Sequence, residues 1–520
     1  MQISLKSCAL VLLLSAASLA VWAEAPAQLT DPVALAPVAE IQKTTSHQTT
    51  ISGRVIRYQA TAGTLTIRSD DGKPAASMFY VAYVATRADK AAPPRPLTFF
   101  FNGGPGSASL WLNVGGFGPL HAPTASPKPT GLPPYEFGPA DSSLLDKTDM
   151  VFLDAIGTGY SRTLLDTRES QFWGVDADVN AFARAITRYV TINRRGNSPK
   201  FLFGESYGTT RAAALVYKLQ TQGMDFNGVV LLSTILNFGS QQPGLDEQYI
   251  HLLPSYAATA WYHGRVAHEP ADFAAFLQGV REYAQGPYAA ALAKGHGIPP
   301  AEEQEVARRL HDIIGLSADY LKQSRLRIDM EAFRKALLEE RGQVIGRFDS
   351  RFTAPAAATP GGGAMDPATN DPATRGVGSA YLSTYRDYLS GELGYSSDLD
   401  YRALYNMVIE PAWDMHHKAP GLDEPLTTPN TALDLAAAMR GNPQLQVYCL
   451  NGLYDLATPF FATEFDVSHM LLSAELRKNV QFAYYETGHM AYGDQAALRS
   501  MKSDLSRFYD LAAPLPTKRW

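Results

Sequence analysis

The sequence predicts an α/β protein with a mostly parallel central sheet, helices on both faces of the sheet and an inserted helical cap. Three observations lead to this prediction. Short, wholly apolar runs alternate with amphipathic segments of helical period, which is typical of parallel strands covered by helices. Between residues 241 and 394 the apolar runs stop and the helical period continues alone. Apolar residues make up 46% of the 520 positions, which is enough to bury a large core.

The N-terminus is typical of an export signal. Lys6 is followed by an apolar run from residue 8 to residue 20, and Val21-Trp22-Ala23 supplies the residues that a signal peptidase needs. We expect residues 1–23 to be a signal peptide cleaved after Ala23, and the mature protein to be periplasmic or secreted, without stable membrane insertion. An uncleaved anchor is the alternative, but the run is too short to cross a bilayer comfortably.

The core of the fold is predicted in two parts, residues 47–240 and 395–520, after a flexible leader at residues 24–46 that is rich in Ala, Pro and Thr. The first part opens with alternating segments that predict antiparallel strands at residues 50–57, 64–68 and 78–84. Gly63 and Asp70-Asp71-Gly72 are expected to break these segments and to form the tight turns between the strands. Wholly apolar runs predict buried strands at residues 96–101, 149–154, 200–203, 228–233, 445–450 and 480–485. Amphipathic helices are predicted at residues 176–189, 210–220 and 495–509.

The cap insertion covers residues 241–394 and contains no predicted buried strand. Its helical periodicity is clearest at residues 302–314 and 330–338. Residues 353–376 consist largely of Ala, Pro and Gly, and this composition predicts a disordered, mobile loop within the cap.

Charge and cysteine content exclude several classes of protein. The net charge is −6 and charged residues are 18% of the chain, so no basic patch for nucleic acid is predicted. No cluster of His, Cys, Asp and Glu has the spacing of metal ligands, and neither a metal nor another cofactor is predicted. Removal of Cys8 with the signal peptide leaves Cys449 without a disulfide partner. Cys449 is expected to be a small buried hydrophobe in a strand and not a catalytic thiol.

A candidate nucleophile lies at the end of one buried strand. Gly204-Glu205-Ser206-Tyr207-Gly208 has the pattern G-x-S-x-G, which is common and weak by itself. Here a predicted strand runs directly into the pattern and a predicted helix follows, so Ser206 would stand on a sharp turn at the carboxyl edge of the sheet. An ordinary turn serine is the alternative. The context favours a catalytic serine and, with it, an α/β-hydrolase fold.

A serine nucleophile needs a general base, and the base needs an acid that orients it. In this fold the chain order is serine, acid, histidine. Asp455 follows the last strand but one, and His489 follows the last strand, so Ser206, Asp455 and His489 satisfy both the order and the placement. Asp154 also follows a strand, but it precedes the serine in the chain.

The other histidines are weaker candidates for the base. His416 and His417 stand in a polar loop beside Lys418 and are expected to be solvated. His469 stands in an apolar helical stretch and is expected to be a buried histidine of the core.

A glycine-rich loop, Asn102-Gly103-Gly104-Pro105-Gly106, follows the first buried strand. Glycines at this position allow backbone N–H groups to point at a developing oxyanion, and the N–H group of Tyr207 would be a second donor. A phosphate-binding loop is the alternative, but no G-K-[ST] follows the glycines.

These motifs together resemble the serine carboxypeptidase family (peptidase family S10), as a bacterial-type exported member. The resemblance spans roughly residues 99–509. It is carried by Asn-Gly-Gly-Pro-Gly-Ser-Ala-Ser at 102–109, Asp-Ala-Ile-Gly-Thr-Gly-Tyr-Ser at 154–161, Gly-Glu-Ser-Tyr-Gly at 204–208, the segment at Asp455, and Gly-His-Met at 488–490. The family has an α/β-hydrolase core with a helical cap. Its members remove C-terminal residues from peptides, and some relatives are acyltransferases.

The resemblance implies a role for each catalytic residue. Ser206 is the nucleophile, His489 the base and Asp455 its orienting acid. Gly104 and Tyr207 provide the oxyanion hole. The substrate is implied to be a peptide or a small acyl compound.

The resemblance also implies a substrate-binding site at Asn102, Gly103 and Glu205, in which Asn102 and Glu205 help to bind a C-terminal carboxylate. Two positions depart from the family pattern: Ser107 replaces a cysteine, and Gly116 replaces the second glutamate of an acidic pair. Because half of the pair is missing, we expect weak discrimination between a peptide acid and its amide. The alternative is that another side chain, for example from the cap, has taken over the missing role.

The sequence therefore predicts a serine-type carboxypeptidase-like hydrolase that acts through an acyl-enzyme. An esterase or acyltransferase on the same scaffold is the first alternative, which the glycine at position 116 favours and Asn102 and Glu205 disfavour. A catalytically inactive peptide-binding protein is the alternative from another class, and the intact triad argues against it.

Overall fold

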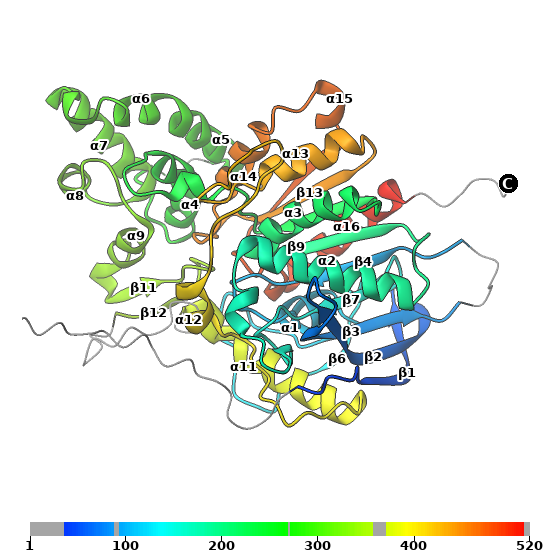
Figure 1. Ribbon diagram of the computed structural model, residues 1–520. Helices are drawn as coiled ribbons and strands as arrows, with labels where there is room; N and C mark the ends of the chain where they lie inside the picture. The colour runs from blue at the N-terminus through cyan, green and yellow to red at the C-terminus, as the bar shows by residue number, and fades with distance from the viewer. Residues whose placement is uncertain (1–35, 88–92, 269–270, 357–370, 514–520) are drawn as a thin grey trace, which may run out of the picture. The chain divides into compact units, whose positions relative to one another are not determined.

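The computed structural model describes residues 36–87, 93–268, 271–356 and 371–513 (Figure 1). The predicted signal peptide and most of the predicted leader lie outside the described residues. The leader prediction is wrong at its end, because residues 42–46 already belong to strand β1 (Gln42–Ile51), which pairs along its whole length with β2 (Arg54–Arg68).

The central sheet has the strand order β1-β2-β3-β7-β4-β9-β10-β13-β14, and a short strand, β8 (Arg162–Thr163), pairs with β3. β1, β2 and β3 are antiparallel, and from β7 onward neighbouring strands are parallel. The prediction of a mostly parallel sheet is confirmed. The remaining strands of the sheet are β3 (Pro74–Ala85), β4 (Leu97–Phe101), β7 (Asp149–Leu153), β9 (Lys200–Glu205), β10 (Gly228–Leu232), β13 (Gln446–Gly452) and β14 (Val480–Tyr485).

The turns predicted in the antiparallel part are partly misplaced. The first hairpin turns at Ser52-Gly53, inside the segment predicted as one strand. Gly63, which was expected to break a strand, lies within β2 instead. A Cβ atom at this position would lie 2.7 Å from the carbonyl oxygen of Ile41. The glycine therefore allows close packing of the chain and does not make a turn.

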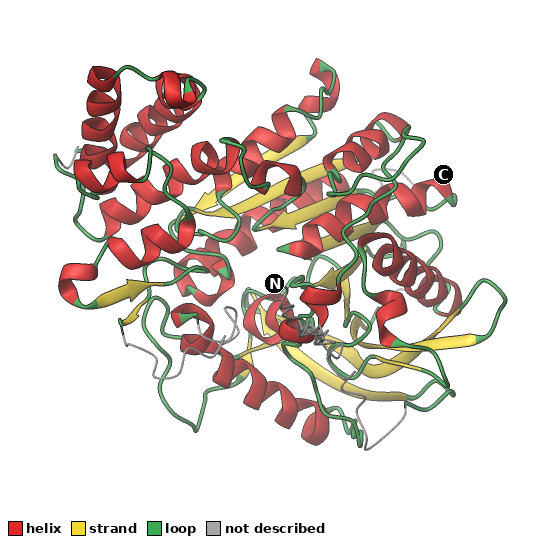
Figure 2. Cartoon of the chain, turned by 60° about the vertical axis from the view of Figure 1, so that its left-hand side comes forward, coloured by secondary structure: helices red, strands yellow, loops and turns green. Residues whose placement is uncertain are grey.

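Helices cover both faces of the sheet (Figure 2). Along β4, Phe99 and Phe101 pack into one apolar cluster and Phe100 into another. The first cluster includes side chains of α2 (Val175–Ile192), α3 (Tyr207–Thr221) and α13 (Ala432–Gly441). The second includes side chains of α11 (Pro372–Asp387) and α16 (Gln495–Ala512). Burial on both faces explains why the parallel strands are wholly apolar in sequence.

The insertion divides into two parts by its packing. Helices α4 to α9 share an apolar cluster of their own, to which residues 453–461 contribute, and Figure 1 shows them grouped in green beside the sheet. Helix α11 packs on the sheet instead. The cap helices are α4 (Glu247–Tyr262), α5 (Phe273–Tyr283), α6 (Ala289–Leu292), α7 (Pro300–Ile314), α8 (Ala318–Gln323) and α9 (Met330–Ala336).

The predicted mobile loop is too long at both ends. Strand β12 (Thr353–Pro355) pairs with β11 (Gln343–Ile345) in a ribbon that the sequence did not predict. Asp371 caps the first turn of α11 with its side chain, so residues 371–376 belong to a helix and its cap and not to a loop. Residues 357–370 lie outside the described residues. The other short elements are α1 (Leu110–Leu112), β5 (Leu120–His121), β6 (Gly138–Pro139), α12 (Asn406–Ile409), α14 (Phe460–Ser468) and α15 (Ala474–Arg477).

Two further observations concern the chain as a whole. Within the described ranges, none of the helices has the length and apolar content of a membrane span. Cys449 is a free, fully buried thiol in β13, and burial raises its pKa to about 12. The prediction that Cys449 is a buried hydrophobe is confirmed.

Candidate active site

Ser206 stands on the turn between β9 and α3, with φ +59° and ψ −131°. A positive φ is strained for a serine, and such strain is typical of a nucleophile on a sharp strand-to-helix turn. The glycines of the motif make this turn possible. A Cβ atom at Gly204 would lie 2.1 Å from the carbonyl oxygen of Gly208. The turn raises Ser206 into a pocket at the carboxyl edge of the sheet.

The glycine-rich loop lies directly against this turn. A Cβ atom at Gly103 would be 2.4 Å from the backbone nitrogen of Tyr207, so only glycine fits here. Gly104 follows with φ +104°. Gly104, Ser206 and Tyr207 line the same pocket, so both residues predicted to supply the oxyanion donors lie in the pocket of the serine.

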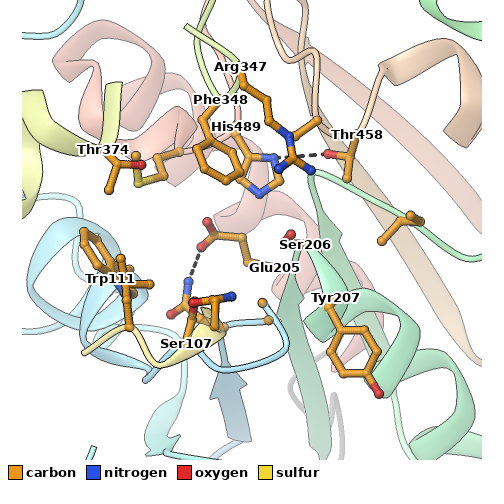
Figure 3. Close-up of a pocket in the computed structure, with 18 of the residues that line it drawn as sticks. Ser107, Trp111, Glu205, Ser206, Tyr207, Arg347, Phe348, Thr374, Thr458 and His489 are labelled. Atoms are coloured by element: carbon orange, nitrogen blue, oxygen red, sulfur yellow. Dashed lines mark hydrogen bonds between the residues drawn. The ribbon is translucent and has the colours of Figure 1, made fainter. Parts of the chain in front are cut away.

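Asp455 and His489 meet in the loops that follow β13 and β14. Nδ1 of His489 lies 2.7 Å from Oδ2 of Asp455. The hydroxyl of Thr458 also donates to Oδ2, over 2.7 Å, and the N–H groups of Ala457 and Thr458 donate to Oδ1. Asp455 is fully buried behind the histidine, whose ring faces the pocket above Ser206 (Figure 3).

Burial of His489 disfavours the charged ring, but the carboxylate of Asp455 outweighs this effect and the pKa of His489 is raised. Glu205 acts in the same direction and Arg347 opposes it. Because Asp455 holds the proton on Nδ1, Nε2 is the nitrogen left to accept a proton from the pocket.

Glu205 is buried beside Ser206 with a partner on each carboxyl oxygen. The amide of Asn102 donates a 2.6 Å hydrogen bond to Oε2, and the hydroxyl of Tyr492 donates a 3.1 Å bond to Oε1. Burial raises the pKa of Glu205 to about 7, while His489 and both donors act against this rise. Gly116 lies against the ring of Tyr492, so the position where the family pattern has a second glutamate is next to a tyrosine.

The structure brings together every residue predicted for the site. Asp455 lies behind the histidine, and the others line one pocket: Asn102, Gly103, Gly104, Glu205, Ser206, Tyr207 and His489. Among the described residues, no group of His, Cys, Asp and Glu has the arrangement of a metal site.

The rival acid lies elsewhere. Asp154 is fully buried and accepts hydrogen bonds from the hydroxyl groups of Ser109, over 2.7 Å, and Tyr401, over 3.1 Å. Burial raises its pKa to about 6. Asp154 thus connects the loops that carry Ser109 and Tyr401 by hydrogen bonds, and it does not orient His489.

The predictions for the other histidines are wrong for His417 and His469. His417 is buried, with Nδ1 2.6 Å from Asp176 and Nε2 2.8 Å from Asp434, because two carboxylates from α2 and α13 compensate for its loss of water. His469 is exposed, because it caps the C-terminus of α14 and stacks on Phe465 at the surface.

Three residues that support the site were not predicted from the sequence. Thr458 supports Asp455, and Tyr492 supports Glu205. Arg211 is fully buried, pairs with Asp178 at 2.6 Å and donates a 2.7 Å hydrogen bond to the carbonyl of Asn102. Thr458 follows Asp455 closely enough to be considered as a capping partner, but no local pattern marks Tyr492 or Arg211.

The fold and the site define a serine hydrolase of the α/β-hydrolase class. Residues 53–273 match the model of the serine carboxypeptidase family, and this match confirms the resemblance seen in the motifs. The matched segment contains the glycine-rich loop and Ser206, whereas Asp455 and His489 lie beyond it. No curated protein matches the chain.

Solved structures with a similar fold are distant in sequence. A proline iminopeptidase from Mycobacterium smegmatis is 12% identical over 86% of this chain and 98% of its own, with a TM-score of 0.36. A carboxyl esterase from Bacillus coagulans is 12% identical over 86% and 97%, with a TM-score of 0.35. A peroxisomal α/β-hydrolase from Saccharomyces cerevisiae is 9% identical over 93% and 92%, with a TM-score of 0.34.

Proposed function

We propose that the protein is an exported serine-type carboxypeptidase-like hydrolase, which releases C-terminal residues from peptides through an acyl-enzyme on Ser206. One observation carries the proposal: His489, whose Nδ1 lies 2.7 Å from Oδ2 of Asp455, lines the same pocket as the strained Ser206. The match of residues 53–273 to the serine carboxypeptidase family supports the choice of peptides as substrates.

In the proposed reaction, Oγ of Ser206 attacks the carbonyl carbon while Nε2 of His489 takes the hydroxyl proton. The N–H groups of Gly104 and Tyr207 stabilise the oxyanion. The C–N bond then breaks as His489 gives its proton to the leaving amine. Water attacks the ester in the same way, with His489 as base, and Ser206 regains its proton when the acid leaves.

Asn102, Gly103 and Glu205 form the proposed substrate-binding side of the pocket. Protonated Glu205 would donate a hydrogen bond to a substrate carboxylate, whereas ionised Glu205 would repel it. Since the pKa of Glu205 is raised to about 7, both forms are present near neutral pH. The proposed site therefore binds the carboxylate of a peptide acid best below neutral pH, where Glu205 is protonated.

Esterase or acyltransferase activity is the second candidate, and it is favoured by Tyr492, which lies against Gly116. A tyrosine, and not a second carboxyl group, occupies the space beside Glu205. Time-resolved mass spectrometry of a mixed library of peptide acids, peptide amides and esters separates the two candidates. Sequential loss of C-terminal residues supports the proposal, and turnover of esters alone contradicts it.

A further inference from the structure

The turn between β11 and β12, residues 346–352, joins the cap to both loops of the triad. The carbonyl of Arg347 accepts a 3.1 Å hydrogen bond from the N–H group of Leu456, close to the acid. The carbonyl of Phe348 accepts a 2.6 Å hydrogen bond from the N–H group of His489 itself. The backbone of this turn is therefore held in a fixed position over the site.

A buried ion pair adds a side-chain connection to the same turn. Nη2 of Arg351 lies 2.7 Å from Oδ2 of Asp349, and both side chains are nearly excluded from solvent. Arg351 also donates hydrogen bonds to the carbonyl of Glu486, over 2.8 Å, and to the hydroxyl of Thr487, over 2.9 Å. Arg351 thus links the cap turn to the loop that carries His489 by two hydrogen bonds.

Arg347 extends from this turn into the pocket without an anionic partner. Among the described residues, no carboxylate lies within ion-pair distance of its guanidinium, and its side chain makes no hydrogen bond to another residue. Its Nε atom is shielded from solvent and unpaired. The ring of Phe348, with its centroid 5.3 Å from Cζ, is its packing partner. A shielded cationic donor without an acceptor is costly, and a bound anion would satisfy it.

Arg347 and Glu205 lie on different sides of the histidine. In Figure 3 the guanidinium lies on the Thr458 side of the His489 ring, and Glu205 lies on the Trp111 side. A carboxylate bound at Arg347 is consequently separate from one bound beside Asn102 and Glu205.

We propose that Arg347 forms an anion-binding subsite that selects substrates with an acidic side chain in the acyl part, the part that becomes attached to Ser206. This inference rests on the proposed function, which places the C-terminal carboxylate beside Asn102 and Glu205. The carboxylate at Arg347 then belongs to the preceding residue, so the preferred peptides carry Asp or Glu as their penultimate residue. A guanidinium binds a carboxylate by two parallel hydrogen bonds, which makes the selection geometric as well as electrostatic.

The test compares kcat/KM for peptides with Glu or Gln as the penultimate residue, each as a free acid and as an amide. We expect the unmutated enzyme to prefer Glu over Gln by about 10- to 100-fold. Arg347→Met abolishes this preference, and Arg347→Glu shifts it to a penultimate Lys. Arg341→Met is the matched control, because Arg341 is an exposed arginine of the same cap segment and does not line the pocket.

The inference is overturned if Arg347→Met keeps the Glu/Gln ratio, or if it changes only the ratio of acid to amide. In the latter case Arg347 binds the terminal carboxylate. Failure of the proposed function is measured separately with the p-nitrophenyl esters of N-acetylglutamate and N-acetylglutamine, which differ only in the acyl part. If peptides are not cleaved but the glutamate ester is preferred in an Arg347-dependent way, the peptidase proposal fails and the subsite stands. Equal rates for the two esters overturn the subsite.

Discussion

The hydroxyl of Tyr492 donates a 3.1 Å hydrogen bond to Oε1 of Glu205, and the ring of the same tyrosine lies against Gly116. A Cβ atom at Gly116 would lie 3.4 Å from Cγ of Tyr492, so a longer side chain there and the tyrosine ring would compete for the same space. A neutral phenol, and not a second carboxyl group, is thus the partner of Oε1 of Glu205. Gly116→Glu alone is expected to displace Tyr492 and not simply to add an acid.

Tyr492→Phe is expected to raise the pKa of Glu205 above its value of about 7. The hydroxyl of Tyr492 stabilises the ionised carboxylate, and the variant loses this hydrogen bond. The ratio of kcat/KM for a peptide acid to kcat/KM for its amide should fall as pH rises through about 7 in the unmutated enzyme, since ionised Glu205 repels the substrate carboxylate. The ratio removes the titration of His489, which affects both substrates equally. In the variant this fall should move to higher pH, by about one unit or less. The pH–rate profiles of the two substrates measure it, with the exposed Tyr262→Phe as control. Identical profiles for Tyr492→Phe and the unmutated enzyme would contradict the prediction.

Ser206→Ala and His489→Ala should each lower kcat by about 10,000-fold or more, and Asp455→Asn should cost less than either. The reason is that serine and histidine both take part in the proton transfer, whereas the aspartate orients the ring. Steady-state ester hydrolysis gives the rates, and intact mass after treatment with a fluorophosphonate reports the nucleophile. Ser468→Ala, at an exposed serine, is the control. Continued labelling of Ser206→Ala would show that another residue is the nucleophile.

Thr458→Val should reduce kcat by about tenfold. The change removes the hydroxyl that donates to Oδ2 of Asp455 over 2.7 Å, while the backbone N–H group of residue 458 still holds Oδ1. The carboxylate stays in place but is less firmly oriented, so an intermediate loss is expected. Kinetics at the pH optimum measure it, and Thr458→Ser should recover most of the activity. A Thr458→Ser variant as slow as Thr458→Val would argue against a role for the hydroxyl.

The sequence predicted those parts of the site that follow from chain order. Ser206, Asp455 and His489 each stand just after a strand, and parallel strands bring their carboxyl ends to one edge of the sheet. Arg347 and Tyr492 have no such local signal, because packing of the cap and of a loop places them. No periodicity in the sequence reveals that a single turn of the cap contacts two loops far away in the chain.

His417 illustrates the same limit. The polar residues around it predict a solvated loop, but its two partners are 241 and 17 residues away in the sequence. Burial of a histidine between carboxylates is a tertiary property. The fold class was predictable because it depends on repeated local patterns. The ends of individual strands and helices were harder to predict. Gly63, for example, serves a close contact within a strand and not a turn.

The export prediction concerns residues outside the described part of the chain. We propose that the mature protein begins at Glu24 and carries one thiol, Cys449. Intact mass of the secreted or periplasmic form should correspond to residues 24–520 and should not change on reduction, because the thiol is buried and has no partner in the mature chain. A mature form that retains Cys8, or a dimer that reduction separates, would contradict this proposal.

His417→Gln should destabilise the fold in a pH-dependent way. Burial alone would lower the pKa of His417, but hydrogen bonds to Asp176 and Asp434 raise it from 6.5 to about 9. The folded state therefore favours the protonated histidine. The contribution of this protonation to the free energy of unfolding is complete below pH 6.5. This contribution declines between pH 6.5 and 9 and is absent above pH 9, because the folded and unfolded proteins then bind the same number of protons.

A shift of this size corresponds to roughly 3 kcal/mol in the free energy of unfolding. Urea titrations at pH 6 and pH 9.5 measure the difference between His417→Gln and the unmutated protein. His416→Gln is the matched control, because His416 is its exposed neighbour and should change little at either pH. The loss in free energy of unfolding caused by His417→Gln should be largest at pH 6 and small at pH 9.5. An equal loss at both values would mean that His417 stabilises the fold by packing and neutral hydrogen bonds, and not by its charge.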